Sequence, residues 1–289
     1  MLYIFHKVCY TLTMNEYTKA LKNLTTIVTK NLDGFIFSYR INNPEPGATN
    51  IPRHVHPYYE LMYIDGGEVE FIVENRRYVL KKGDVLIIKP AEYHYARRLF
   101  SVPYARYCIA FSPEFTFDKN FTENLLTKGE KFSISEDSNF AYLAKVLRAK
   151  AETTSEHDVV FFRSIIDAML ISLCDAKPEK SGIITGENNF QRILSYINLH
   201  LTSIQSVNDI ANSLFFSKSY IMHLFKSELH VGVMQYIRNK KILLAHQKIR
   251  KGEKPTEVYS TCGFSNYPSF YRAYTAYFGT SPKCAKYVE

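Results

Sequence analysis

The sequence predicts an α+β chain of two domains. The first is an N-terminal antiparallel β-barrel with following helices. The second is a C-terminal all-α domain in which a long helix joins two helix-turn-helix motifs. Three observations predict this fold class: apolar residues alternate with a period of two from residue 35 to residue 111, the period then becomes helical, and the helix-turn-helix pattern occurs twice near the C-terminus.

The predicted strands of the first domain lie at residues 35–41, 60–65, 68–74, 77–80, 84–89 and 104–111. Asp65, Gly66 and Gly67 form a hairpin-turn signal, and Gly83 marks a second turn. Many short strands with glycine turns are typical of a barrel or a jelly roll. We expect residues 14–33 to be a helical or irregular lead-in and residues 42–52 to be a loop.

The helical period returns at residues 140–150 and 158–175. The second segment has one apolar stripe, formed by Val160, Phe161, Ile165, Met169 and Leu173. Two interpretations of the stripe are a helix–helix surface in a homodimer and packing against the barrel of the same chain. We expect the barrel at 14–137, helices with a role in dimerisation at 138–175, a polar linker at 176–189 and the helical domain at 190–289.

The first helix-turn-helix pattern spans residues 207–229. Ala211 is the small residue that lets a second helix cross at close range. Ser217 can cap the N-terminus of that second helix, whose buried stripe would be Ile221, Leu224 and Phe225. The opposite face is left for contacts outside the domain and carries Lys218, Ser219, Met222, His223 and Lys226.

The second pattern spans residues 255–277. Pro255 suits a first helical turn, Gly263 suits the left-handed end of that helix, and Ser265 or Asn266 can cap the next one. The inner residues of this last helix would be Phe270, Tyr274 and Phe278, and the outward ones Tyr267, Ser269, Tyr271 and Arg272.

The segment between the two patterns, residues 233–251, would form a helix about 28 Å long at 1.5 Å per residue. One turn of B-DNA is about 34 Å. A rigid helix of this length could place two recognition helices in successive major grooves on one side of a duplex.

The net positive charge is confined to residues 188–289, which contain both helix-turn-helix patterns. The chain carries a net charge of +8, and residues 188–289 hold 13 Lys and Arg but only 5 Asp and Glu, whereas the preceding residues hold 23 of each. This distribution indicates a nucleic-acid binder. The alternative is a solvated basic surface, which charge alone does not separate from it.

Three other features of the sequence limit the class of protein and its expected cellular compartment. No apolar run reaches 18 residues, so no membrane span is expected. The first ten residues lack the pattern of a secretion signal, and Met14 is an alternative start. Five cysteines without close pairs indicate reduced thiols in a cytoplasm.

Residues 188–289 resemble the DNA-binding domain of AraC-type (AraC/XylS) transcription regulators. The residues that carry the resemblance are Ala211, Phe216, Ser217, Ile221, Leu224, Phe225, Lys226, Tyr236, Arg238, Ile242, Ala245, Gly263, Phe264, Ser265, Ser269, Phe270, Phe278, Gly279 and Pro282. Lys241 stands where the family usually has Arg, and Tyr259 where it usually has a small Ala. The resemblance implies DNA contacts by Ser217, Lys218, Ser219, Met222, His223, Lys226, Asn266, Tyr267, Tyr271 and Arg272.

The barrel region carries a pattern that resembles the cupin signature: His54, His56 and Glu60, followed by Gly83, Asp84, Pro90 and His94. Two imidazoles, a carboxylate and a later imidazole could ligate Fe, Mn, Zn or Ni. The sensor domains of AraC-type regulators resemble the same pattern and commonly bind no metal there, and Pro57 could bend the strand. We therefore expect no metal and no cofactor.

In that case the same residues would bind a polar or sugar-like effector. The candidate effector residues are His54, His56, Tyr58, Glu60, His94, Tyr95 and Arg97, through hydrogen bonds and ring stacking. Each of them could equally be an ordinary residue of the barrel wall.

The predicted function is a cytoplasmic, sequence-specific transcription regulator that is not an enzyme. Its expected partners are double-stranded promoter DNA, a small-molecule effector, a second copy of the chain in a homodimer and RNA polymerase, with no membrane contact. The alternative is a cupin-type metal-dependent enzyme, an oxygenase or isomerase, with an accessory basic domain. The charge distribution and the duplicated motif favour the regulator.

Overall fold

The computed structural model describes residues 24–42, 54–74, 76–97, 103–118, 120–179, 183–184 and 189–286. The chain divides into two compact units. The sheet unit contains the described residues between 24 and 54 and between 58 and 184. The helical unit contains residues 189–286, with which residues 55–57 are grouped.

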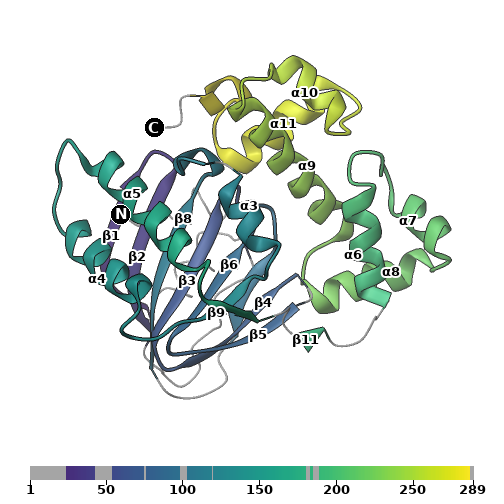
Figure 1. Ribbon diagram of the computed structural model, residues 1–289. Coiled ribbons are helices and arrows are strands. Elements are labelled where there is room, and N and C mark those ends of the chain that lie inside the picture. Colours follow the sequence, from purple (N-terminus) through teal and green to yellow (C-terminus); the bar gives the residue numbers. More distant parts are fainter. Residues whose placement is uncertain are drawn as a thin grey trace. The chain divides into compact units, whose positions relative to one another are not determined.

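Two antiparallel sheets form the sheet unit (Figure 1). The larger has the strand order β1-β2-β8-β3-β6-β9-β10, and the smaller β11-β5-β4-β7. The strands are β1 Leu24–Leu32, β2 Phe35–Asn42, β3 Tyr59–Gly66, β4 Glu68–Val73, β5 Arg76–Lys81, β6 Asp84–Ile88, β7 His94–Arg97, β8 Tyr104–Phe111, β9 Lys131–Ser133, β10 Lys177–Glu179 and β11 Ile183–Ile184. All six predicted strands are present within one residue at each end.

Strand β1 contradicts the prediction of a helical or irregular lead-in for the part of it that the structure describes. Leu24–Leu32 is rich in Thr and other residues that favour a pleated strand. Gly34 has a φ of +71° and closes a tight turn, so that Leu32 pairs with Phe35 of β2. Residues 14–23 and 43–52 of the predicted lead-in and loop lie outside the described residues.

The predicted linker, residues 176–189, contains two strands that the sequence did not predict. β10 pairs with β9, and β11 pairs with β5. Residues 177–179 and 183–184 therefore extend the two sheets.

The larger sheet has two different faces because side chains alternate along each strand. Phe35, Phe37 and Tyr39 of β2 belong to a core cluster shared with helices that cover one face. On the other face, Met62 and Leu86 join residues of the smaller sheet in a second cluster. The two sheets thus pack against each other across this second core.

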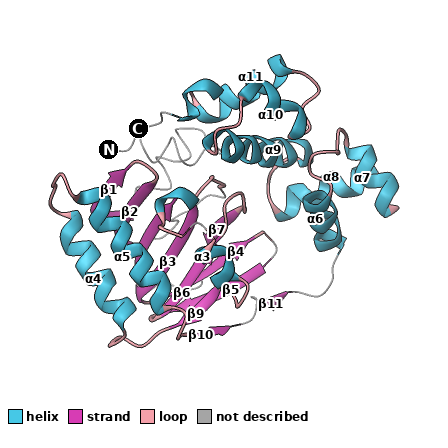
Figure 2. Cartoon of the chain, turned by 45° about the horizontal axis from the view of Figure 1, so that its top comes forward, coloured by secondary structure: helices cyan, strands magenta, loops and turns pink. Residues whose placement is uncertain are grey.

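Three helices belong to the sheet unit: α3 Phe121–Leu126, α4 Asn139–Ala151 and α5 Asp158–Ser172. Figure 2 shows α4 and α5 beside the larger sheet, whose apolar face they share. Ser138 caps α4 by accepting a hydrogen bond from the backbone N–H of Ala141. Asp158, at the start of α5, forms ion pairs with Lys150 and Lys30, which hold the pKa of its carboxyl group well below the usual range.

Burial assigns the apolar stripe of α5 mainly to the interior of the same chain. Met169 and Leu173 are fully buried in the core under α4 and α5, and Phe161 and Ile165 pack against that core. Val160 alone of the five is largely exposed. The interpretation of the stripe as a dimer surface is wrong for its buried members, because the sheet already covers them.

The helical unit contains α6 Asn189–Leu199, α7 Val207–Leu214, α8 Lys218–Glu228, α9 Val233–Arg250, α10 Pro255–Thr261 and α11 Tyr267–Phe278. The pairs α7–α8 and α10–α11 are the two predicted helix-turn-helix motifs, and α9 is the predicted long helix between them. No helix in the described ranges is long and apolar enough to cross a membrane.

Lys241 of α9 ties the two motifs together. Its ammonium group donates to the backbone carbonyl of Ile204, just before α7, at 2.6 Å and to that of Gly263, just before α11, at 3.0 Å. Gly263 has a φ of +80°, and a Cβ there would lie 2.0 Å from the carbonyl oxygen of Thr202. The backbones of the two motifs therefore meet at a point where only glycine fits.

A buried histidine stabilises the second motif. The ring of His246 on α9 stacks on Phe278 with centroids 4.3 Å apart, and its Nδ1 lies 2.7 Å from the hydroxyl of Tyr274. Burial, with a smaller contribution from the charge of Arg250, lowers the pKa of His246 to about 3. The folded helical unit therefore holds this ring in its neutral form.

Acid should destabilise the helical unit through His246. In the unfolded chain this ring binds a proton below about pH 6.5, whereas the folded chain does not bind it until about pH 3. The contribution of His246 to the free energy of unfolding is therefore largest at neutral pH. It falls by up to about 1.4 kcal/mol per pH unit as the pH drops below about 6.5. Denaturant titrations of wild type and His246→Gln between pH 7 and pH 4 should show a shallower dependence in the variant, and equal slopes would contradict this account.

Candidate functional site

Helix α8 presents a polar face that its packing leaves uncovered. Ile221 and Phe225 are fully buried and hold the helix against the domain. Ser217 accepts a hydrogen bond from the backbone N–H of Tyr220 at 3.1 Å and so begins the helix. The remaining predicted contact residues of this motif, Lys218, Ser219, Met222, His223 and Lys226, are all exposed.

Helix α11 is built in the same way. Asn266 is the capping residue, because its side chain accepts from the backbone N–H of Ser269 at 2.9 Å. Tyr271 and Arg272 are exposed, as predicted, whereas Tyr267 is half-buried with its ring edge-on to Tyr259 at 5.8 Å. The tyrosine at position 259 thus supports Tyr267, which has a packing role besides any contact outside the domain.

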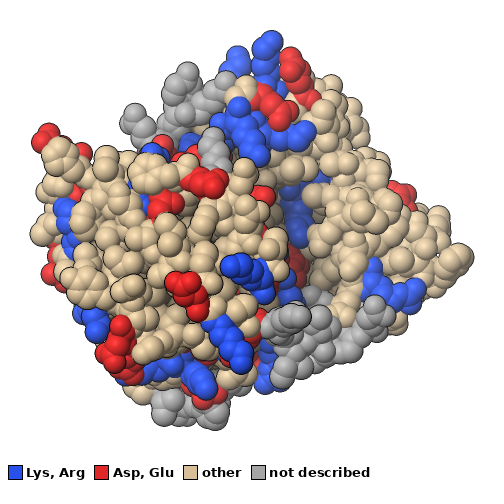
Figure 3. Space-filling view, in the orientation of Figure 1, with Lys and Arg blue, Asp and Glu red and all other residues tan. Residues whose placement is uncertain are grey.

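The two exposed helix faces carry the chemistry of DNA contact. Lysine and arginine side chains neutralise phosphates, and polar side chains on a helix in the major groove can read base edges. Figure 3 shows Lys and Arg side chains gathered around the part of the helical unit that carries α10. This agrees with the excess of basic over acidic residues in this segment of the sequence.

A second cluster of functional interest lies outside the two helix-turn-helix motifs. His54, His56, Glu60 and His94 offer ligand atoms that all lie within 4.8 Å of one another. The chain is not a continuous strand here: His54 forms an isolated bridge with His94, and β3 begins only at Tyr59, after Pro57. The expected break at Pro57 is therefore present, and the side chains converge in spite of it.

His94 and Glu60 form the buried centre of this cluster. His94 Nδ1 lies 2.9 Å from the carbonyl oxygen of Glu92, and its Nε2 lies 2.9 Å from Glu60 Oε2. A carbonyl only accepts, so Nδ1 carries a proton. Burial alone would lower the pKa of His94, but the hydrogen bond to Glu60 and its charge outweigh burial and raise it. The hydrogen bond to Glu60 thus favours proton binding at the His94 ring.

The same donor set suits a divalent transition metal. Imidazole nitrogens and a carboxylate are ligands for Zn, Fe, Mn or Ni, and the hydrogen bond of Nδ1 to the Glu92 carbonyl makes Nε2 the ring nitrogen of His94 that could coordinate. A metal would be held by these imidazole nitrogens and the Glu60 carboxylate, and it would require the His94 Nε2 atom to be unprotonated. The residues present fit a metal as well as the direct hydrogen bond between His94 and Glu60, and the expectation of no metal stays a prediction.

The other predicted effector residues do not all join this cluster. On β7, His94 and Ala96 face the core between the sheets, so Tyr95 lies on the opposite face. Tyr58 is partly exposed just before β3. For Arg97 the structure describes the backbone alone, paired with Glu70 of β4.

Sequence reasoning missed four polar residues that share the interior face with Glu60. Ser38 and Arg40 on β2 pair with Cys108 and Arg106 on β8, and all four are buried. Cys108 donates its thiol hydrogen to Glu60 Oε1 at 2.8 Å, and burial together with Glu60 raises the pKa of that thiol well above its usual value. The signal was the alternation of polar and apolar residues within both strands.

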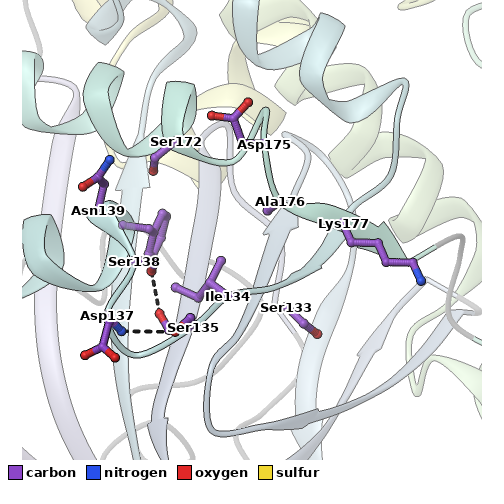
Figure 4. A pocket seen from close by; sticks show the side chains of 11 residues that line it. Ser133, Ile134, Ser135, Asp137, Ser138, Asn139, Ser172, Asp175, Ala176 and Lys177 are labelled. Carbon is purple, nitrogen blue, oxygen red and sulfur yellow. Dashed lines mark hydrogen bonds between the residues drawn. The ribbon is translucent and has the colours of Figure 1, made fainter.

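A separate open pocket of about 490 Å³ lies between β9 and the ends of α4 and α5 (Figure 4). Two of its serine hydroxyls are engaged in local structure. Ser138 donates to the carbonyl of Ser135 at 2.6 Å while capping α4, and Ser172 donates to the carbonyl of Met169 at 2.7 Å. We assign no ligand to this pocket.

Family models match both units. Residues 39–150 match the model described as an AraC-like ligand binding domain, and residues 210–286 match a helix-turn-helix domain. A ligand-binding sheet unit followed by a double helix-turn-helix unit defines a transcription regulator. The chain belongs to the AraC-type family of transcription regulators.

Individual relatives are similar over different lengths. The probable transcriptional regulator LumQ of Photobacterium leiognathi is 36% identical over 95 residues, which are 32% of this chain and 38% of that protein. The uncharacterised HTH-type transcriptional regulator YfiF of Bacillus subtilis (strain 168) is 22% identical over 246 residues, 79% of this chain and 76% of that protein. The crystal structure of ToxT from Vibrio cholerae O395 is 16% identical, covering 87% of this chain and 96% of that one, with a TM-score of 0.37.

Two substitutions should separate base contacts from phosphate contacts. Arg272→Ala should reduce discrimination at one base pair by about 1–3 kcal/mol, whereas Lys218→Ala should weaken binding to all sequences alike and lower the salt slope by about one. Affinities for a set of single-base operator variants at two salt concentrations measure both effects. Lys145→Ala, an exposed helix lysine of the sheet unit, is the control and should change neither. A uniform loss with Arg272→Ala would identify that residue as a phosphate contact.

Replacing Lys241 should loosen the two motifs. Lys241→Met leaves the carbonyls of Ile204 and Gly263 without this donor, which should lower the free energy of unfolding by about 1–3 kcal/mol. Lys241→Arg keeps the donors and should lose less. Denaturant unfolding and DNA affinity of both variants measure this. A Met variant as stable as wild type would show that the two carbonyls need no partner.

Proposed function

We propose that this regulator binds double-stranded promoter DNA through α8 and α11 and responds to a small molecule held between its two sheets. The observation that carries the proposal is the pair of capped helices, each buried on one face and exposed with polar side chains on the other. The family membership of both units supports it.

In this proposal the two motifs divide the DNA contacts between phosphates and bases. Lys218 and Lys226 neutralise phosphates, while Ser219, Met222 and His223 set sequence preference. Ser217 and Asn266 hold the helix N-termini toward the backbone of the duplex. Tyr267, Tyr271 and Arg272 make the corresponding contacts of the second motif, with Arg272 the candidate for a bidentate contact to guanine.

We further propose that the chain acts as a cytoplasmic homodimer with RNA polymerase as a partner at the promoter. The surface offered for dimerisation is the exposed apolar side of the helical layer on the sheet unit, where Tyr142, Val160 and Ile171 are more than half exposed. Effector binding would shift α4 and α5 and so change how two DNA-binding units sit on paired sites.

The positions of the side chains in the structure change the chemical class of effector that we expect. A sugar-like molecule was predicted partly from aromatic residues near the barrel rim, but Tyr95 does not share a face with His94. The polar side chains that do share the interior are largely ionisable: Arg40, Glu60, His94 and Arg106.

A second candidate function rests on the cluster of His54, His56, Glu60 and His94, whose donor set fits a metal. A metal-dependent enzyme would hold metal in stoichiometric amount and lose it on His54→Ala. A regulator needs no metal and keeps its DNA binding after the same substitution.

The deciding experiment measures DNA binding and metal content on one sample. Purified full-length protein is titrated with fragments of its own genomic neighbourhood at two salt concentrations, beside elemental analysis. We expect a preferred sequence, affinity that falls steeply as salt rises, and unchanged DNA binding in His54→Ala. One tightly held metal per chain without any sequence preference would favour the enzyme instead.

A further inference from the structure

The interior face of the larger sheet carries two adjacent cross-strand pairs of polar residues. Ser38 lies opposite Cys108, and Arg40 lies opposite Arg106, in the antiparallel register of β2 and β8. Cβ atoms of directly opposite residues are about 4.5–5.5 Å apart. Tyr104 and Cys108 belong to the core between the two sheets, and Arg106 lies between them on the same face.

Arg106 is buried, and its guanidinium carbon lies 5.1 Å from the centroid of the Tyr104 ring. It is 2% exposed; one end of the guanidinium donates to the Tyr104 hydroxyl, and its Nε has no hydrogen-bond partner. Within the described ranges it forms no ion pair. An arginine side chain stays protonated even when it is buried, because arginine has a pKa above about 12. Burying such a charge is costly unless an anion faces it.

Ser38, a neighbour on the same face, also lacks a hydrogen-bond partner for its side chain. Its hydroxyl is completely buried. Arg40 places a second guanidinium directly across from the first, and like charges in that position repel. The nearby carboxylate of Glu60 is already bonded to His94 and Cys108. The Ser38 hydroxyl and the Nε of Arg106, both without a hydrogen-bond partner, therefore lie on the same interior face.

We propose that Arg106 and Ser38 form an oxyanion subsite between the two sheets, and that the effector carries a carboxylate or phosphate group held there. This rests on the proposed function as an effector-responsive regulator and names the chemical class of the effector. A planar guanidinium matches a carboxylate or phosphate with two parallel hydrogen bonds, and the Ser38 hydroxyl supplies a third donor. An uncharged sugar would not supply a negative charge opposite the guanidinium of Arg106.

The test is the melting temperature of the full-length protein with simple probes. Inorganic phosphate and acetate are each titrated against sodium chloride at equal ionic strength, with glucose as the uncharged probe. We expect a saturable rise of about 2–4 °C with phosphate or acetate and none with chloride or glucose. The larger of the two rises distinguishes a phosphate-bearing effector from a carboxylic acid.

Variants connect the response to Arg106. Arg106→Met should abolish the rise and should not lower the melting temperature without oxyanion, because an apolar side chain replaces an unsatisfied charge. Arg148→Met is the matched control: that guanidinium lies 3.8 Å from the Tyr39 ring centroid, on the helix-covered face of the same sheet, so its loss should leave the oxyanion response intact.

Three results would overturn the proposal: a wild-type protein that responds to chloride as to oxyanions, an Arg106→Met variant that keeps the rise, or one that melts far below wild type without any oxyanion. DNA binding measured in parallel separates the two levels of inference. Salt-sensitive, sequence-preferring binding without an oxyanion response would reject the subsite alone. Absence of DNA binding would reject the regulator function itself.

Discussion

The alternation of side chains along β2, β3 and β8 is the constraint on which the sheet unit depends. One set of residues, such as Phe35, Phe37 and Tyr39, is apolar and packs under α4 and α5. The other set faces the smaller sheet and mixes apolar residues with Ser38, Arg40, Glu60 and Arg106. A shift of one residue in register would exchange the two sets. The same pleat therefore provides both the stable core and the polar interior.

In the helical unit, the two small helix-turn-helix motifs must be held in a fixed arrangement relative to each other. Each motif has its own buried stripe and capping residue, with Ser217 in the first and Asn266 in the second. Neither is large enough to bury much apolar surface alone. Lys241 and the close backbone approach at Gly263 join them where α9 passes between. The positions of α8 and α11 are thereby coupled in space.

Local sequence signals predicted the strands with clear alternation and the helices with clear caps. They failed where the deciding partner lay far away in the chain. Residues 24–32 were not predicted to form a strand, and their pairing with β2 shows that they do. For Met169 and Leu173 the sequence left open a dimer surface or packing within the chain, and only the position of the sheet decides between them. The position of Arg106 was not predicted, because only the pairing of β2 with β8 and the second sheet place it in the interior.

The linkage through Lys241 has a consequence for the DNA as well as for the protein. Helix α9 has 18 residues and is about 27 Å long, whereas successive major grooves on one side of straight B-DNA are about 34 Å apart. If the motifs are held at the shorter spacing, the duplex must curve toward the protein to admit both helices. Base pairs between the two contact sites would then matter through their flexibility, although no side chain reads them.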